Sequence, residues 1–187
     1  MHHHYFIYKP YGVLSQFKCE LPKKKLLGSL YAFAPATMAI GRLDEDSEGL
    51  LYLTTDGMVS EKIRSKNVPK EYFVQVDGII TNEALTHLAD GVFITINKQQ
   101  YNTKKCNVYL LESEPVLPKR AKNIRHAKHG PTSWISITLH EGKFRQIRRM
   151  TAAVGFPTLR LVRVRIGSFW MPYLDAGQVI EVDQLYY

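Results

Sequence analysis

Cysteine, long apolar runs and targeting signals are all scarce in this chain of 187 residues. The two cysteines, Cys19 and Cys106, lie 87 positions apart and match no metal-binding or redox spacing, so reduced thiols are expected. No apolar stretch approaches the ~18 residues of a membrane span. The first residues also lack the charged region, apolar core and cleavage site of a signal peptide, so a cytoplasmic location is expected. Residues 1–4, Met-His-His-His, are typical of an affinity-tag remnant.

Internal repeats and low-complexity segments are absent as well. A chain of this length can bury a core without disulfides or metals. The apolar pattern predicts many strands and few, scattered helices, which favours an α+β fold over a regular βαβ series. We expect residues 5–187 to form one domain, either undivided or as two lobes that share one sheet.

Apolar periodicity and turn residues place the expected elements. Strands are predicted over residues 5–8, 38–43, 50–53, 71–76, 93–96, 105–111, 134–139, 159–166 and 178–182. Helices are predicted over residues 26–33, 57–64, 82–88 and 144–154. Asp56 and Thr81 are the expected N-caps of the second and third helices, and Gly91 and Gly155 follow the ends of the third and fourth.

Acidic residues are nearly absent from residues 119–165, where twelve Lys or Arg face a single acid, Glu141. This window carries +11, and the rest of the chain carries −3 of the net charge of +8. Such a field predicts a polyanion partner, and nucleic acid is favoured over membrane because no amphipathic anchor or lipidation motif is visible. A solvated charged face is the alternative. The predicted RNA contacts are Lys119, Arg120, Lys122, Arg125, Lys128, Lys143, Arg145, Arg149, Arg160 and Arg163. Residues 119–131 lack periodicity and are expected to form a surface loop that orders on RNA.

Asp44 stands in a polar turn between two predicted strands, in the stretch Gly-Arg-Leu-Asp-Glu-Asp-Ser-Glu-Gly at residues 41–49. An acid displayed in this way can be a nucleophile, a general base, a metal ligand or a plain turn residue. Asp44, Asp46 and Glu48 have the spacing of a calcium loop, but Thr55 replaces the required Glu and the flanks read as strands. Calcium binding is therefore disfavoured.

Two further segments carry candidate residues. Residues 141–150 open a predicted helix with four cations, which is unfavourable to the helix dipole and suggests that the charge serves phosphates or an anionic side chain. A basic RNA-facing helix without a catalytic member is the alternative. Lys70-Glu71-Tyr72 begins a predicted strand, and Tyr72 is either an ordinary core aromatic or a platform for a base.

These segments occur in an order that resembles the RsuA-type pseudouridine synthases. The resemblance extends from the Lys-Pro-Tyr-Gly of residues 9–12, through residues 41–57 and 70–74, to Arg-Gln-Ile-Arg at 145–148 and to residues 161–167. It implies a pseudouridine synthase fold, with a mostly antiparallel mixed sheet flanked by helices and loops. It also implies roles for single residues: Asp44 is the nucleophile, Arg148 pairs with it and holds it as the anion, Tyr72 packs on the flipped uracil, Arg42 supports the site, and Leu161 and Ile166 line the uracil pocket.

The activity implied by the resemblance is isomerisation of uridine to pseudouridine in ribosomal RNA, without a cofactor or metal. Residues 155–161, together with the lack of room for an S4 domain before residue 9, favour 23S rRNA or a large-subunit precursor as the substrate of a monomeric enzyme. Attack on the sugar and abstraction of a ribose proton are both open to Asp44. Glu71 departs from the small residue common in the family, but on a strand it points away from Tyr72.

Two other function classes compete with this interpretation. A non-catalytic ribosome-assembly or rRNA-binding protein on the same scaffold explains the basic segment, but it leaves the acid Asp44 unexplained. A nuclease would need clustered carboxylates to hold metal, and Asp44, Asp46 and Glu48 are the only such group.

Overall fold

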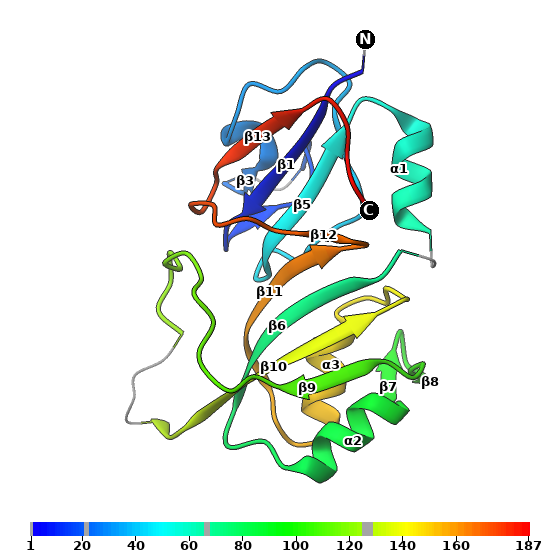
Figure 1. The fold of residues 1–187 in the computed structure, drawn as a ribbon, viewed down its shortest axis with the longest axis vertical. Helices are drawn as coiled ribbons and strands as arrows, with labels where there is room; N and C mark the ends of the chain where they lie inside the picture. Colours follow the sequence, from blue (N-terminus) through cyan, green and yellow to red (C-terminus); the bar gives the residue numbers. More distant parts are fainter. Residues whose placement is uncertain (1, 21–22, 66–67, 125–128) are drawn as a thin grey trace. The chain divides into compact units, whose positions relative to one another are not determined.

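The computed structural model describes residues 2–20, 23–65, 68–124 and 129–187 (Figure 1). Its contacts divide the chain into two compact units. Unit 1 comprises Met1–Val68, Leu117–Lys122 and Val162–Tyr187, and unit 2 comprises Pro69–Val116 and Asn123–Leu161. Each unit therefore combines segments that lie far apart in the sequence.

The sheet of unit 1 is built around β1 (His4–Lys9), which is antiparallel to β5 (Glu48–Thr54) on one side and to β13 (Val179–Val182) on the other. The short β4 (Met38–Ala39) is antiparallel to β5. The second half of β11 (Thr158–Ile166) is parallel to β5 and antiparallel to β12 (Phe169–Trp170). Every residue of β1 and β5 is buried, so these strands form the interior of the unit.

The other elements of unit 1 are short. A parallel pair joins β2 (Val13–Leu14) to β3 (Lys25–Leu26), and a 3₁₀ turn, η1, covers Leu27–Ser29. Helix α1 (Gly57–Arg64) begins after Asp56, whose carboxylate accepts hydrogen bonds from the amides of Met58 and Val59, which confirms the predicted N-cap.

Unit 2 contains an antiparallel sheet in which β10 (Thr132–Leu139) lies between β6 (Lys70–Asp77) and β9 (Asn107–Leu110). The hairpin of β7 (Phe93–Ile96) and β8 (Gln99–Asn102) forms a separate sheet. Helices α2 (Asn82–Asp90) and α3 (Gln146–Ala153) contribute to one apolar core with the strands, formed by Val74, Val76, Ile80, Ala84, Leu88, Ile94, Ile135, Ile137, Leu139, Ile147, Met150 and Leu161.

The mixed sheets and the three helices in the described residues confirm the predicted α+β class, but five predicted elements are shorter than expected. Two of them are the strands over residues 105–111 and 178–182, which span only Asn107–Leu110 and Val179–Val182. The helix over residues 26–33 is only η1, since Tyr31 and Phe33 leave the helical path and pack their rings against Tyr5. The strand over residues 38–43 stops at Ala39, and the chain then turns at Gly41 with φ of +72°. Helix α3 begins at Gln146 rather than at residue 144, because Arg145 adopts a left-handed φ of 52°.

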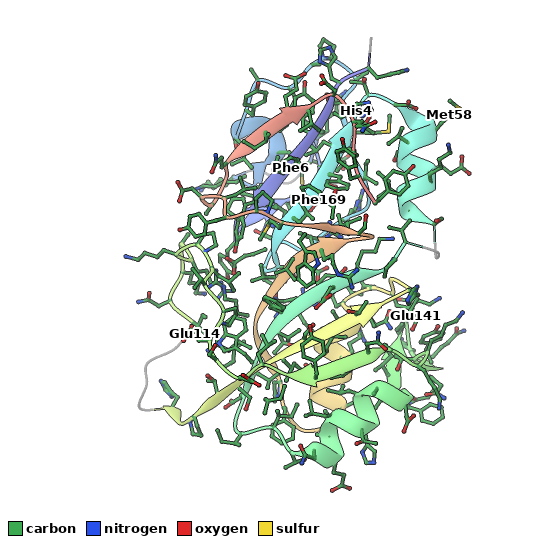
Figure 2. All side chains as sticks on the ribbon, viewed as in Figure 1. His4, Phe6, Met58, Glu114, Glu141 and Phe169 are labelled. Atoms are coloured by element: carbon green, nitrogen blue, oxygen red, sulfur yellow. The ribbon has the colours of Figure 1, made fainter. Side chains whose placement is uncertain are left out.

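The segment interpreted as a tag remnant continues into the sheet. His4 is the first residue of β1, and its Nδ1 lies 2.9 Å from the Thr54 hydroxyl (Figure 2). Among the residues that the structure describes, no helix combines the length and the apolar character that a membrane crossing requires.

Gly49 allows β5 and β11 to approach closely. Its φ is +102°, and a Cβ at this position would lie 2.3 Å from the carbonyl oxygen of Arg163 and 2.7 Å from its amide nitrogen. Backbone atoms cannot move aside as the tip of a flexible side chain can. Only glycine therefore fits at the point where the Asp44 loop enters β5.

We expect Gly49→Ala to lower the free energy of unfolding by about 3 kcal/mol or more, because it adds a backbone clash to the cost of a left-handed residue. Gly41→Ala is the matched control: its φ is +72°, but no atom lies within 4 Å of the added Cβ. That control should lose only about 1–2 kcal/mol. Urea unfolding of both variants measures the difference, and equal losses would contradict the close approach.

Candidate active site

A serine from another segment, Ser15, makes two hydrogen bonds to the loop that carries Asp44. The Ser15 hydroxyl donates a hydrogen bond of 2.8 Å to the carbonyl of Leu43 and accepts one of 3.0 Å from the amide of the same residue. On the other side, the amide of Ser47 donates to the carbonyl of Asp44 at 3.1 Å. Leu43 is buried and Asp44 half-buried. The backbone around Asp44 is thus held from both directions.

Glu45 adds two more ties to the same loop. Its carbonyl accepts a hydrogen bond of 2.8 Å from the amide of Gly12, and its carboxylate pairs with Lys24 Nζ at 2.8 and 2.9 Å. The sequence interpretation missed Lys24, although the run of three lysines at residues 23–25 was a visible signal. Arg42, predicted to support the site, is exposed at the start of this loop.

Arg120, a predicted RNA contact, has partners inside the protein that the sequence did not indicate. Its Nε lies 3.1 Å from the carboxylate of Glu48, which is 1% exposed, and its guanidinium lies 4.1 Å from the centre of the Tyr11 ring. The Tyr8 hydroxyl donates to the same carboxylate at 3.2 Å. A buried carboxylate requires a counter-charge, so Arg120 stabilises Glu48 within the protein. Its predicted contact with RNA stays a prediction.

Two more predicted RNA contacts, Arg160 and Arg163, are buried in β11, with exposures of 7% and 4%. Arg163 Nε donates a hydrogen bond of 2.7 Å to the carbonyl of Leu50. Both side chains are therefore buried rather than on the surface, and Arg163 joins β11 to β5. The sequence could not separate them from surface cations, because the run at residues 159–166 alternates arginine with apolar residues on a strand that is buried on both faces.

The other predicted RNA contacts also stay predictions, and they differ in exposure. Lys119, Lys122 and Lys143 are exposed, and Arg145 and Arg149 are half-buried. Arg125 and Lys128 lie outside the described residues.

Tyr72 and Arg148 both belong to unit 2, whereas Asp44 belongs to unit 1. Tyr72, on β6, is half-buried and packs against the apolar core, and Arg148 is half-buried on α3. Of the two predicted uracil-pocket residues, Leu161 is in the core of unit 2 and Ile166 is buried in unit 1. Their predicted roles stay predictions.

Glu71, the departure from the family pattern, has a defined place. It is 3% exposed, and its carboxylate accepts hydrogen bonds from the Tyr109 hydroxyl at 2.8 Å and the Ser136 hydroxyl at 2.7 Å. The larger side chain is thus accommodated by partners on β10, the neighbouring strand, and on β9, the strand beyond it.

Glu141, labelled in Figure 2, organises the chain before α3. Its carboxylate accepts hydrogen bonds from the Tyr101 hydroxyl at 2.5 Å, the Gln146 side chain at 2.7 Å and the Lys104 amide at 3.0 Å. Burial alone would raise the pKa of Glu141, but these hydrogen bonds outweigh it and lower the pKa. In sequence, the only signal for this role was that Glu141 is the single acid among the cations.

No three His, Cys, Asp or Glu side chains are grouped to hold a metal ion within the part of the chain that the structure describes. Of the carboxylates with calcium-loop spacing, Glu48 points to Arg120 and Tyr8.

Known proteins are similar to this chain over most of its length. The family described as RNA pseudouridylate synthase matches residues 3–153. The chain belongs to this family. It is 45% identical over 174 residues to the ribosomal large subunit pseudouridine synthase E of Xanthomonas campestris pv. campestris, covering 91% of this chain and 90% of that protein. It is 41% identical over 178 residues to the protein of the same name from Vibrio parahaemolyticus, covering 94% and 71%. The resemblance inferred from the motifs is confirmed.

Solved structures share the fold. A crystal structure of a pseudouridylate synthase superposes with a TM-score of 0.78 at 21% identity, covering 97% of this chain and 70% of that one. The human RNA pseudouridylate synthase domain containing 1 gives a TM-score of 0.57 at 14% identity, covering 98% and 80%. These similarities confirm the predicted pseudouridine synthase fold.

Lys9 of this pseudouridine synthase is a fully buried cation beside the Asp44 loop. Its ammonium donates hydrogen bonds to the carbonyls of Pro10 at 2.9 Å and Val13 at 2.7 Å. Burial lowers the pKa of Lys9 from 10.5 to about 8, although the carboxylates of Glu48, Asp46 and Asp44 favour its charged form. The folded protein therefore releases this proton at a lower pH than the unfolded chain does.

We expect the stability of the wild-type synthase, relative to Lys9→Met, to rise with pH between about 8 and 10.5. In that window the unfolded chain binds more protons than the folded one, so deprotonation favours folding. The gain should approach about 3 kcal/mol. Urea unfolding at several pH values measures it. A difference that stays constant or falls as the pH rises would contradict the buried, depressed lysine.

Proposed function

We propose that this pseudouridine synthase isomerises a uridine of 23S rRNA, free or in a large-subunit precursor, and that it acts as a cytoplasmic monomer. Four relatives with 41–45% identity are named ribosomal large subunit pseudouridine synthase E, which supports the large-subunit substrate. The exposed Lys119, Lys122 and Lys143 would meet the phosphates of such a substrate.

The observation that carries the proposal is the anchored loop of Asp44. A nucleophile acts efficiently only when it is held close to its reactive geometry, and hydrogen bonds from Ser15, Ser47 and Gly12 hold this backbone. A protein that only bound rRNA would have no need to fix an acid near phosphates. This feature favours the enzyme over a non-catalytic rRNA-binding protein on the same scaffold.

In the proposed reaction the target nucleotide is flipped out of its stack, as enzymes that act on bases commonly require. The bond between C1′ and N1 breaks, the uracil rotates, and a bond between C1′ and C5 forms. The proton on C5 is lost, and N1 gains one, so the product is an isomer of the substrate. Asp44 is the nucleophile, Arg148 stabilises its negative charge, and Tyr72 stacks on the uracil, while Arg42 supports the loop.

We expect Asp44→Asn to lower pseudouridine formation in a 23S rRNA transcript by about 10³-fold or more, with the affinity for RNA nearly unchanged. The amide is nearly isosteric with the carboxylate but is a far weaker nucleophile. Single-turnover assays and filter binding measure the two quantities. A rate within tenfold of the wild type would remove Asp44 from the chemistry.

We expect Arg148→Ala to lower the single-turnover rate at saturating RNA by about a hundredfold, because it removes the proposed counter-charge of Asp44. Arg145→Ala is the matched variant, from the residue immediately before α3. It should mainly weaken binding and lower the salt slope of log affinity by about one. Equal losses of rate, or a larger loss for Arg145→Ala, would show that the partner of Asp44 is misassigned.

A further inference from the structure

The loop at residues 142–145, before α3, presents an aromatic ring to solvent between cations. Phe144 is 62% exposed, and the Arg149 guanidinium lies 5.6 Å from the centre of its ring. Arg149 is itself fixed by a hydrogen bond from its guanidinium to the carbonyl of Thr95. Lys143, next to Phe144, is exposed, with its ammonium 4.7 Å from the centre of the Tyr101 ring.

This loop is anchored, even though its tip is exposed. Gln146 accepts a hydrogen bond of 3.0 Å from the Lys143 amide and donates one of 2.7 Å to Glu141, which also accepts from Tyr101. Arg145 has a left-handed φ of 52°, a conformation that costs about 1–2 kcal/mol in a residue with a side chain. The hydrogen bonds of Glu141 and Gln146 maintain that strained turn. Phe144 is thus presented on a fixed backbone.

We propose that Phe144 is a stacking platform for an unpaired nucleotide of the RNA substrate, whose neighbouring phosphates lie against Lys143 and Arg149. The proposal rests on the proposed function and adds a binding subsite to it. Every base has an aromatic face, so a fixed ring flanked by cations suits single-stranded RNA without a sequence requirement. The charge supports the same partner, because Glu141, the only acid of the segment, is engaged within the protein.

The test compares Phe144→Ala, Phe144→Trp and Tyr173→Ala in binding to a 23S rRNA transcript over a series of salt concentrations. Phe144→Ala should weaken affinity by about five- to a hundredfold, the range for the loss of one base–aromatic stack. Its salt slope should stay that of the wild type, because no phosphate contact is removed. Phe144→Trp should restore the affinity. Tyr173, 68% exposed and in unit 1, is the control aromatic and should have no effect when replaced.

Several outcomes would overturn the subsite. These are unchanged affinity of Phe144→Ala, a lowered salt slope, failure of tryptophan to restore binding, or a change in oligomeric state that places Phe144 at a protein interface. Thermal unfolding confirms that each variant is folded. The parent proposal is tested separately with Asp44→Asn: if that variant binds and is inactive while Phe144→Ala binds normally, only the subsite fails.

Discussion

Two hydrogen bonds between the Ser15 hydroxyl and the backbone of Leu43 constrain the residue immediately before Asp44. Ser15 is itself 6% exposed, so water does not compete strongly for its hydroxyl. Beyond the loop, Gly49 lets β5 approach the backbone of Arg163 and fixes where the loop ends. The proposed chemistry depends on this pair of constraints, because a displaced carboxylate loses the geometry that makes it a nucleophile.

The Lys and Arg side chains form two groups, one buried and one exposed. Lys9, Arg120 and Arg163 are buried or nearly so, and each is paired with a carboxylate or a backbone carbonyl. Lys119 and Lys143 are exposed and available to phosphates. The total positive charge of the Lys and Arg side chains is therefore larger than the positive charge exposed to a partner on the surface. Part of this total compensates buried carboxylates such as Glu48, as a low-dielectric interior requires.

Local patterns predicted much of the fold. The caps at Asp56 and Thr81 are confirmed, because each acts on amides two or three residues away. The motif around Asp44 predicted the family, which the comparisons confirm. Contacts between distant segments could not be predicted from local patterns. Glu48 pairs with Arg120, 72 positions away, and no motif near either residue in the sequence indicates this ion pair. Helix α3 begins two residues later than predicted because Arg145 is left-handed. Arginine does not favour that conformation by itself, and the hydrogen bonds of Gln146 and Glu141 stabilise it.

Mapping of pseudouridine along the ribosomal RNA, in cells with the gene and in cells that lack it, tests the central claim most directly. The account predicts that one pseudouridine of 23S rRNA disappears when the gene is lost. It should return with the wild-type gene but not with a gene that encodes Asp44→Asn. An unchanged 23S rRNA map, or full restoration by the Asp44→Asn gene, would contradict the account.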